Sequence, residues 1–383
     1  MRIKLASILT AGLLLATSSL ALAEHHEGHN HEGGGHWTLM GKEGHIGAQY
    51  RFQLTHNDNN FASTKDTDAS KTTSLDLSAL NIGLDGRLNK AVTFDANVHL
   101  QGKLAVAVDE DGAGSTVSDF IHWAYIDWAV NDMITIRGGR DFVNAGGWDN
   151  NNWGMYYDML GSAYRAWNPV AGGGGTADAV EIMVKAGGWV SLQLVNDTVD
   201  GSKTTNSPNK QPAMILEYKG QFGKISPLVQ IGQYDLNDDR FFVLGVKFMA
   251  AGFSGFLDFI NDTRNYKVGT KSMSDVTTAI NLRLDYTMGT YTPFFELTSL
   301  DVKQDGTDSK VNSAALPVAG TPAFDDNAMN WALGVKCNAG MGHHYSPFFV
   351  IKNHSGKFVD SSDGNKEVTR SAMTIQTGVM GEF

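Results

Sequence analysis

The sequence is short of cysteine, of charge and of long apolar runs. One of its 383 residues is cysteine, which excludes an intramolecular disulfide framework and any metal site built from several cysteines. Charged residues make up 19% of the chain, against about 25% in typical soluble domains. The formal net charge of −11 argues against sequence-independent binding of nucleic acid, which depends on a basic surface.

Beyond its first segment the chain has no apolar run of the roughly 18 residues that a membrane-spanning helix needs. The first segment starts with basic residues, continues as an apolar run over 5–20, and ends in a small-x-small sequence at Ala23. These are the features of a secretory signal peptide, which we expect over residues 1–23. If the rest of the chain enters a membrane, it must do so as strands.

From residue 44 onward the dominant pattern is alternation of apolar and polar residues, as in strands with two different faces. Val92, Phe94 and Ala96, for example, are separated by polar residues. The pattern breaks phase within 75–87 and 119–128, where we expect either a β-bulge or a wrongly placed strand boundary. Most of these segments have about ten residues, the length of a tilted strand that crosses a bilayer. About sixteen segments can be counted, centred near 50, 80, 98, 124, 137, 183, 192, 216, 229, 245, 257, 281, 296, 332, 349 and 376.

The connections between these segments are alternately short and long. Membrane barrels have short periplasmic turns and longer outer loops, so the alternation predicts an all-β fold, a transmembrane antiparallel up-and-down β-barrel of about sixteen strands over 44–383. Short turns are expected at 88–90, 130–132, 187–188, 220–223, 250–252, 287–290 and 338–342. Outer loops are expected at 57–72, 105–117, 142–177, 197–211, 235–239, 262–275, 302–327 and 355–369, of which only 235–239 is short.

The last segment carries the most specific pattern in the chain. Met373, Ile375 and Val379 alternate with other residues up to the terminal Phe383. This segment resembles the closing strand of Gram-negative outer-membrane proteins, in which the terminal aromatic residue acts as the assembly signal. Together with the signal peptide and the strands, the whole chain resembles bacterial porins. The hairpin over 125–140 is similar to that of substrate-selective porins, of which the phosphate-selective and siderophore groups are examples.

The resemblance implies a location, partners and a constriction. It implies the outer membrane of a Gram-negative bacterium, a homotrimer, contact with membrane lipid and lipopolysaccharide, and recognition of Phe383 by the assembly machinery. The third outer loop of porins folds into the barrel and narrows it, which implies this role for 142–177. Its aromatic and amide side chains could contact sugar-like solutes, or they could pack the loop against the wall. Its charges predict a slight preference for cations. The constriction residues are expected to be Trp148, Asp149, Trp153, Tyr157, Asp158 and Arg165.

The alternation also predicts which charged side chains face the barrel interior. A barrel of about sixteen strands is too wide for side chains to fill, so an aqueous channel is expected. Selectivity in pores arises from rings of charge of one sign, and the nearly balanced wall alone predicts no strong ion preference. The basic positions are Arg51, Arg87, Lys103, Arg137, Lys185, Lys219, Lys247, Arg283, Lys336 and Lys352. The acidic positions are Asp85, Asp95, Asp127, Glu181, Glu217, Asp258, Asp285 and Glu296.

The segment between the signal peptide and the barrel, 24–43, is rich in histidine and glycine. We expect it to be a periplasmic tail, and imidazoles at this density can bind Zn, Cu or Ni. The alternative is a solvated polar tail without a ligand. No other cofactor is expected. The candidate metal ligands are His25, His26, His29, His31 and His36.

No catalytic motif with the required spacing is found, so we do not expect an enzyme. The sequence predicts a porin that passes small hydrophilic solutes and ions by passive diffusion. The alternatives are a substrate-selective channel for a metal complex or a siderophore, a non-conducting barrel that serves as a surface adhesin, and a soluble secreted β-protein. Aromatic residues beside the short turns predict a ring at one membrane interface, made of Trp128, Tyr218, Tyr286, Tyr291, Tyr345 and Phe383.

Overall fold

The computed structural model describes residues 35–39, 42–61, 71–99, 121–148, 176–195, 213–233, 240–268, 271–305, 327–337, 346–360 and 366–382. Among these residues no helix is long and apolar enough to cross a membrane. The strands are β1 (Gly35–Leu39), β2 (Lys42–Phe61), β3 (Lys71–Arg87), β4 (Val92–His99), β5 (Ile121–Ala129), β6 (Ile134–Phe142), β7 (Thr176–Lys185), β8 (Gly188–Val195), β9 (Ala213–Gly220), β10 (Ile225–Gln233), β11 (Arg240–Ala250), β12 (Phe253–Val268), β13 (Lys271–Tyr286), β14 (Tyr291–Asp305), β15 (Asn327–Cys337), β16 (Ser346–Asp360) and β17 (Lys366–Glu382).

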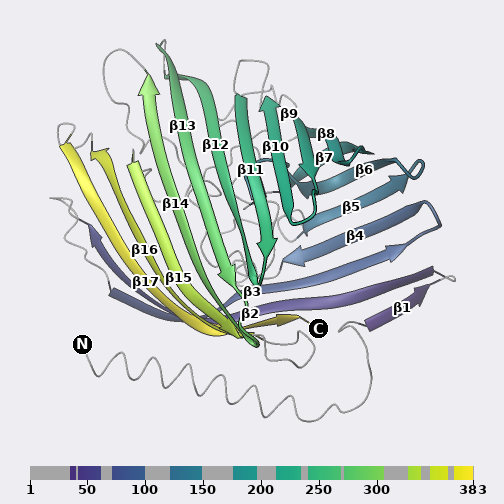
Figure 1. Ribbon diagram of the computed structural model, residues 1–383, viewed down its shortest axis with the longest axis horizontal. Coiled ribbons are helices and arrows are strands. Elements are labelled where there is room, and N and C mark those ends of the chain that lie inside the picture. Colours follow the sequence, from purple (N-terminus) through teal and green to yellow (C-terminus); the bar gives the residue numbers. More distant parts are fainter. Residues whose placement is uncertain are drawn as a thin grey trace, which may run out of the picture.

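The strands β2 to β17 form a closed, sixteen-stranded antiparallel barrel (Figure 1). Each pairs with the next along the chain, and the ring closes where β17 pairs with β2, from Phe61 opposite Arg370 to Gln49 opposite Glu382. All sixteen strand centres predicted from the sequence fall within these strands. The predicted fold class is therefore confirmed.

The short strand β1 lies in the segment that the sequence analysis assigns to the tail. It forms a hairpin with the start of β2, in which Leu39 is opposite Lys42 and Gly35 is opposite Ile46. This pairing uses the part of β2 that β17 does not reach, since β17 ends opposite Gln49. The hairpin thus extends the barrel wall at the seam between the first and last barrel strands.

The two faces of the barrel wall differ in the way that the alternation predicts. On β12, Phe253 and Leu257 point outward and are about half exposed, whereas Phe256 and Asp258, on either side of Leu257, point inward and are buried. Neighbouring strands repeat the pattern, with Leu284 outside and Arg283 inside on β13. The outward apolar residues of β12 span Phe253 to Phe259, which is roughly 20 Å along a strand. An apolar outside around a polar inside is the arrangement that a lipid bilayer requires.

The predicted short turns that the structure describes lie at one end of the barrel, and the turn predicted at 338–342 falls outside the described residues. The chain reverses tightly between β3 and β4, where Leu88 N–H bonds to the carbonyl oxygen of Val92 at 2.9 Å, and again at each later turn of this set that the structure describes. Large aromatic side chains are exposed beside these turns, among them Trp128 and Tyr291. Tyr286 stacks on Phe253 with ring centroids 4.3 Å apart. Tyr345 and Phe383, also predicted for this ring, lie outside the described residues.

Of the two explanations for the broken alternation, the structure shows a β-bulge in both stretches. The pairing of β2 with β3 shifts where Arg51 and Phe52 face Ala79 and Leu77, which leaves one extra residue in β3. The pairing of β4 with β5 shifts by one residue beside Asn97. Each extra residue moves the following side chains back into phase with the neighbouring strand. The broken alternation in the sequence thus has a local structural cause.

The predicted outer loop at 262–275 is wrong. There β12 continues to Val268, β13 begins at Lys271, and the two strands stay paired to the tip. Beyond Phe259 the outward positions of β12 become polar, starting with Asn261, whose amide donates a hydrogen bond to Thr278 Oγ1 at 3.3 Å. A strand that leaves the bilayer loses its apolar face although it keeps its ladder of hydrogen bonds. The alternation in the sequence therefore predicted the end of β12 too early and the start of β13 too late.

Candidate pore lining

The strand register places the predicted interior charges on the inner face of the barrel, apart from Lys103, which lies outside the described residues. The constriction residues Asp149, Trp153, Tyr157, Asp158 and Arg165, and the tail histidines His25, His26, His29 and His31, also lie outside them. Two inner-face carboxylates, Asp141 and Asp262, were missed by the sequence analysis and are buried. Each lies four residues after a predicted interior charge, so the strand period could have found them.

The first charge cluster lies on β5 and β6. The guanidinium of Arg137 donates two hydrogen bonds to Asp127, at 2.7 Å and 2.8 Å, and a third to Asp141 at 2.8 Å. The same guanidinium stacks 3.8 Å from the ring centroid of Tyr125. Two carboxylates therefore surround one cation, which leaves this part of the wall with a local excess of negative charge.

The second charge cluster lies on β13, β14 and β15 and is more deeply buried. Arg283 is fully buried and binds Asp285 through two hydrogen bonds of 3.0 Å and Glu296 through another of 3.0 Å. Lys336 lies 4.0 Å from Asp285, and Arg283 also stacks on Phe294 at 4.4 Å. Two cations and two carboxylates make this cluster neutral as a whole. Such buried charges are tolerated because each has a bonded partner.

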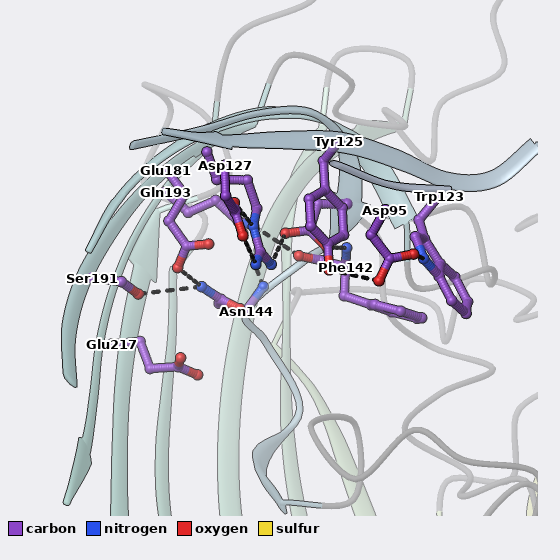
Figure 2. Close-up of polar contacts among 12 residues, drawn as sticks. Asp95, Trp123, Tyr125, Asp127, Phe142, Asn144, Glu181, Ser191, Gln193 and Glu217 are labelled. Atoms are coloured by element: carbon purple, nitrogen blue, oxygen red, sulfur yellow. Dashed lines mark hydrogen bonds and ion pairs between the residues drawn. The ribbon is translucent and has the colours of Figure 1, made fainter. Parts of the chain in front are cut away.

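The chain turns inward directly after β6, and the residues 143–148 are all buried. Asn144 fixes this turn to the wall (Figure 2): its amide donates to Glu181 at 2.7 Å and to Ser191 at 3.3 Å. Gln193 accepts from the backbone N–H of Asn144 at 2.9 Å and donates to the carbonyl oxygen of Phe142 at 2.7 Å. Polar side chains of β7 and β8 thus satisfy the backbone of a segment that has left the sheet.

The inward segment reaches further around the wall through Gly147. Its N–H donates to Gln230 at 3.1 Å, and Gln230 in turn donates to Glu217 at 2.6 Å. Gly147 has a φ of 77° and lies so close to Asp258 that a Cβ there would be 2.5 Å from the carboxylate. Glycine is required for both reasons. The segment therefore crosses the inner face from β6 to β12.

Apolar contacts reinforce this path. Val143 and Ala145 pack against buried inner-face residues that include Ile215, Val243 and Ile260. Farther along the segment, Trp148 packs with Leu228 and Phe256, and Lys247 lies 5.5 Å from the centroid of its ring. Apolar side chains on the inner face of β9 to β12 are thereby removed from water, which contributes to holding the segment inside the barrel.

An aromatic shelf, which we define as Trp123, Tyr125 and Phe142, lies beside the start of this segment (Figure 2). The indole of Trp123 donates to Asp95 at 2.7 Å, and the hydroxyl of Tyr125 donates to the same carboxylate at 3.3 Å. The rings of Trp123 and Phe142 lie 5.3 Å apart at 47°. The three side chains are only partly buried, so the shelf adds apolar surface beside the charged groups of β4 to β6.

Comparison with solved structures decides how this architecture is classified. An anion-selective porin from Comamonas acidovorans has a TM-score of 0.59 and 13% identity, over 88% of this chain and 98% of that one. The chain has the fold of outer-membrane porins. Outer-membrane expressed OmpT of Vibrio cholerae has the same fold at a TM-score of 0.57 and 11% identity, over 91% of this chain and all of that one. OmpF of Salmonella typhi, solved with daunomycin, has a TM-score of 0.52 and 12% identity, over 91% of this chain and all of that one.

The porin fold is shared without recognisable sequence similarity. No protein-family model matches the chain, and no curated protein sequence matches it. The structural similarity to solved porins establishes the fold of this chain. At identities of 11–13% it does not indicate which solute passes, and that question depends on the residues of the inner face.

Proposed function

We propose that the chain is an outer-membrane porin that passes small hydrophilic solutes and ions by passive diffusion. The observation that carries this proposal is the closed sixteen-stranded barrel with an apolar outside and a charged inside. A barrel of this size leaves an aqueous channel rather than a packed core. Porin folds typically have no enzymatic activity, and Arg137 and Arg283 of the wall are engaged in ion pairs with neighbouring carboxylates.

The inward segment supports the proposed constriction. We assign the narrowing of the channel to 142–177, with Trp148 at the start of the narrow part. The backbone N–H groups of Asn144 and Gly147 donate hydrogen bonds to Gln193 and Gln230, which hold the described part of this loop against the wall. The remaining predicted constriction residues continue the same loop in the sequence.

The proposal includes a mild preference for cations. In the part of the chain that the structure describes, the inner face carries the two additional carboxylates Asp141 and Asp262. The cluster around Arg137 contains one cation and two carboxylates. The field of these groups extends over about 8–10 Å at physiological salt, which is comparable with the radius of a restricted pore. The similar porin from Comamonas acidovorans is described as anion-selective, so selectivity must be set by residues and not by the fold.

The proposed setting follows from the same architecture. We propose export through the signal peptide at 1–23, insertion into the outer membrane among lipid and lipopolysaccharide, and assembly signalled by Phe383. We also propose a homotrimer, the form in which OmpT of Vibrio cholerae has been solved, with a TM-score of 0.52 and 10% identity over 88% of this chain and 99% of that one.

Single-channel recording in a planar bilayer tests the channel proposal. Detergent-purified protein should give discrete conductance steps, in groups of three if the trimer is correct. Folding is checked beforehand by heat-modifiable migration on a gel. A correctly folded barrel that leaves the bilayer silent would contradict the proposal and favour a non-conducting adhesin.

A second candidate, a solute-selective channel, is favoured by the aromatic shelf. Trp123 and Phe142 present apolar surface beside the carboxylate of Asp95, a combination suited to solutes with both flat and hydrogen-bonding groups. Competitive block of the ion current by one solute, lost in Trp123→Ala, would support this function. Unchanged block in that variant would place the solute elsewhere in the channel.

A further inference from the structure

One carboxylate of the inner face is bound in a different way from those of the two charge clusters. The carboxylates of the clusters bind Arg137 or Arg283. Asp95 instead accepts hydrogen bonds from the indole of Trp123 at 2.7 Å and from the hydroxyl of Tyr125 at 3.3 Å, and both donors are neutral. Among the residues that the structure describes, Asp95 forms no ion pair with a lysine or an arginine. Its carboxylate is therefore held in place without a bonded cation.

The charges around Asp95 also favour the approach of a cation. Asp85 lies directly opposite Asp95 in the pairing of β3 with β4, and opposed residues of antiparallel strands point to the same face. Asp85 contacts the imidazole of His45 at 3.2 Å. Arg137 attracts Asp95, but its guanidinium is already bound to the two carboxylates of its own cluster. The surroundings of Asp95 thus have an excess of negative charge.

The rings of the aromatic shelf lie beside this carboxylate (Figure 2). The rings of Trp123 and Phe142 are 5.3 Å apart, and both side chains, like Asp95, are only partly buried. The face of an aromatic ring attracts cations, and that of tryptophan attracts them most strongly. The third ring of the shelf already carries a planar cation, since the guanidinium of Arg137 stacks 3.8 Å from the centroid of Tyr125. A second cation can therefore meet both a carboxylate and aromatic surface here.

We propose that Asp95 and the aromatic shelf bind organic cations that have a flat or methylated charged group. Asp95 supplies the negative charge and Trp123 supplies the ring surface, while the hydroxyl of Tyr125 positions the carboxylate. A weakly hydrated cation of this kind lies against a ring at little cost in lost hydration. The inference names the solute class of the solute-selective channel, and it rests on that proposed function for the route by which a solute reaches the inner face.

Isothermal titration calorimetry of the folded full-length protein in a neutral detergent tests the site, with N-methylpyridinium as the probe. Pyridine is the matched ligand, because it has nearly the same shape and is uncharged at slightly alkaline pH. The cation should bind at least about tenfold more tightly than pyridine, since only the cation is attracted by the carboxylate and by the ring faces. Equal affinity for the two ligands would overturn the inference.

Two variants locate the binding site. Asp95→Asn keeps the size of the side chain and removes its charge, so the affinity for N-methylpyridinium should fall at least about tenfold while that for pyridine stays unchanged. Asp178→Asn is the control, because it removes the same charge from the outer face, where Asp178 lies 4.0 Å from Arg140, and it should bind as the wild type does. Unchanged affinity in Asp95→Asn, or an equal loss in Asp178→Asn, would contradict the assignment.

These titrations can be read separately from the test of the channel. Heat-modifiable migration confirms that each variant has folded, and the comparison of the two ligands on the wild type applies even if Asp95→Asn does not fold. Asp95→Glu keeps the charge and should retain the preference for N-methylpyridinium over pyridine. A bilayer that stays silent would contradict the channel proposal and would leave both titrations unaffected.

Discussion

At the scale of single residues, the buried guanidinium of Arg283 has the largest expected effect on stability. Replacing it in Arg283→Met leaves Asp285 and Glu296 buried without their bonded cation. Breaking a buried ion pair from one side costs about 3–5 kcal/mol, and the free energy of unfolding should fall by that amount. Urea unfolding in detergent, followed by tryptophan fluorescence, measures the change.

The matched variant for Arg283 removes all four charges of the cluster together. Arg283→Met combined with Asp285→Asn, Glu296→Gln and Lys336→Met should recover most of the lost stability, since replacing a whole buried ion cluster by neutral groups is often nearly neutral. A single Arg283→Met variant within about 1 kcal/mol of the wild type would contradict the prediction, because that is the worth of an exposed pair.

Gly147 makes a second prediction at this scale. In Gly147→Ala the new Cβ would collide with Asp258, and the φ of 77° adds strain of about 1–2 kcal/mol. The inward segment should move away from the wall, and the single-channel conductance should fall. Gly187→Ala is the control, since Gly187 has a φ of 66° but nothing within 4 Å of the added Cβ. Equal conductance in both variants would show that the contact with Asp258 does not position the segment.

At the scale of elements, the hairpin of β12 and β13 should extend beyond the bilayer. On β13 the outward positions Leu282 and Ile280 are apolar, and the next outward position is the polar Thr278. In a Cys337→Ser background, Thr278→Cys should react with a water-soluble maleimide at least about tenfold faster than Leu282→Cys, because thiolate forms only where water reaches the thiol. Labelling of intact cells measures the two rates, and equal rates would place the membrane boundary elsewhere.

The elements also show what the sequence could predict. Strand identity, the turns at one end and both bulges follow from a period of two, which lipid outside and water inside impose on every strand. The alternation of apolar and polar residues is lost where both faces of a strand contact water, as beyond Asn261. The predicted boundaries of β12 and β13 were wrong for this reason. The ion pairs of Arg137 and Arg283 follow from pairing register, which sequence spacing does not contain. The contact of Gly147 with Asp258 joins residues more than a hundred positions apart, and no local pattern signals it.

At the scale of the whole molecule, the inner face should make the channel mildly cation-selective. In a potassium chloride gradient the reversal potential should have the sign of cation preference. Asp127→Asn removes one of the two carboxylates around Arg137 and should move the permeability ratio toward one. Asp178→Asn is the control, because this exposed carboxylate lies on the outer face, 4.0 Å from Arg140. A wild-type channel that prefers anions would contradict the prediction.

The pairing of β17 with β2 determines the order in which the molecule can assemble. It joins residues 49–61 to residues 370–382, so the contact that closes the ring spans roughly 300 residues and carries the largest loop-closure entropy of any strand pair. The last barrel strand to leave the ribosome is also the one that removes both open edges. Until it arrives, every intermediate exposes unpaired strand edges on which chains aggregate. Such a chain must be kept unfolded after synthesis. A truncated chain that ends before residue 366 lacks β17, the strand that closes the barrel.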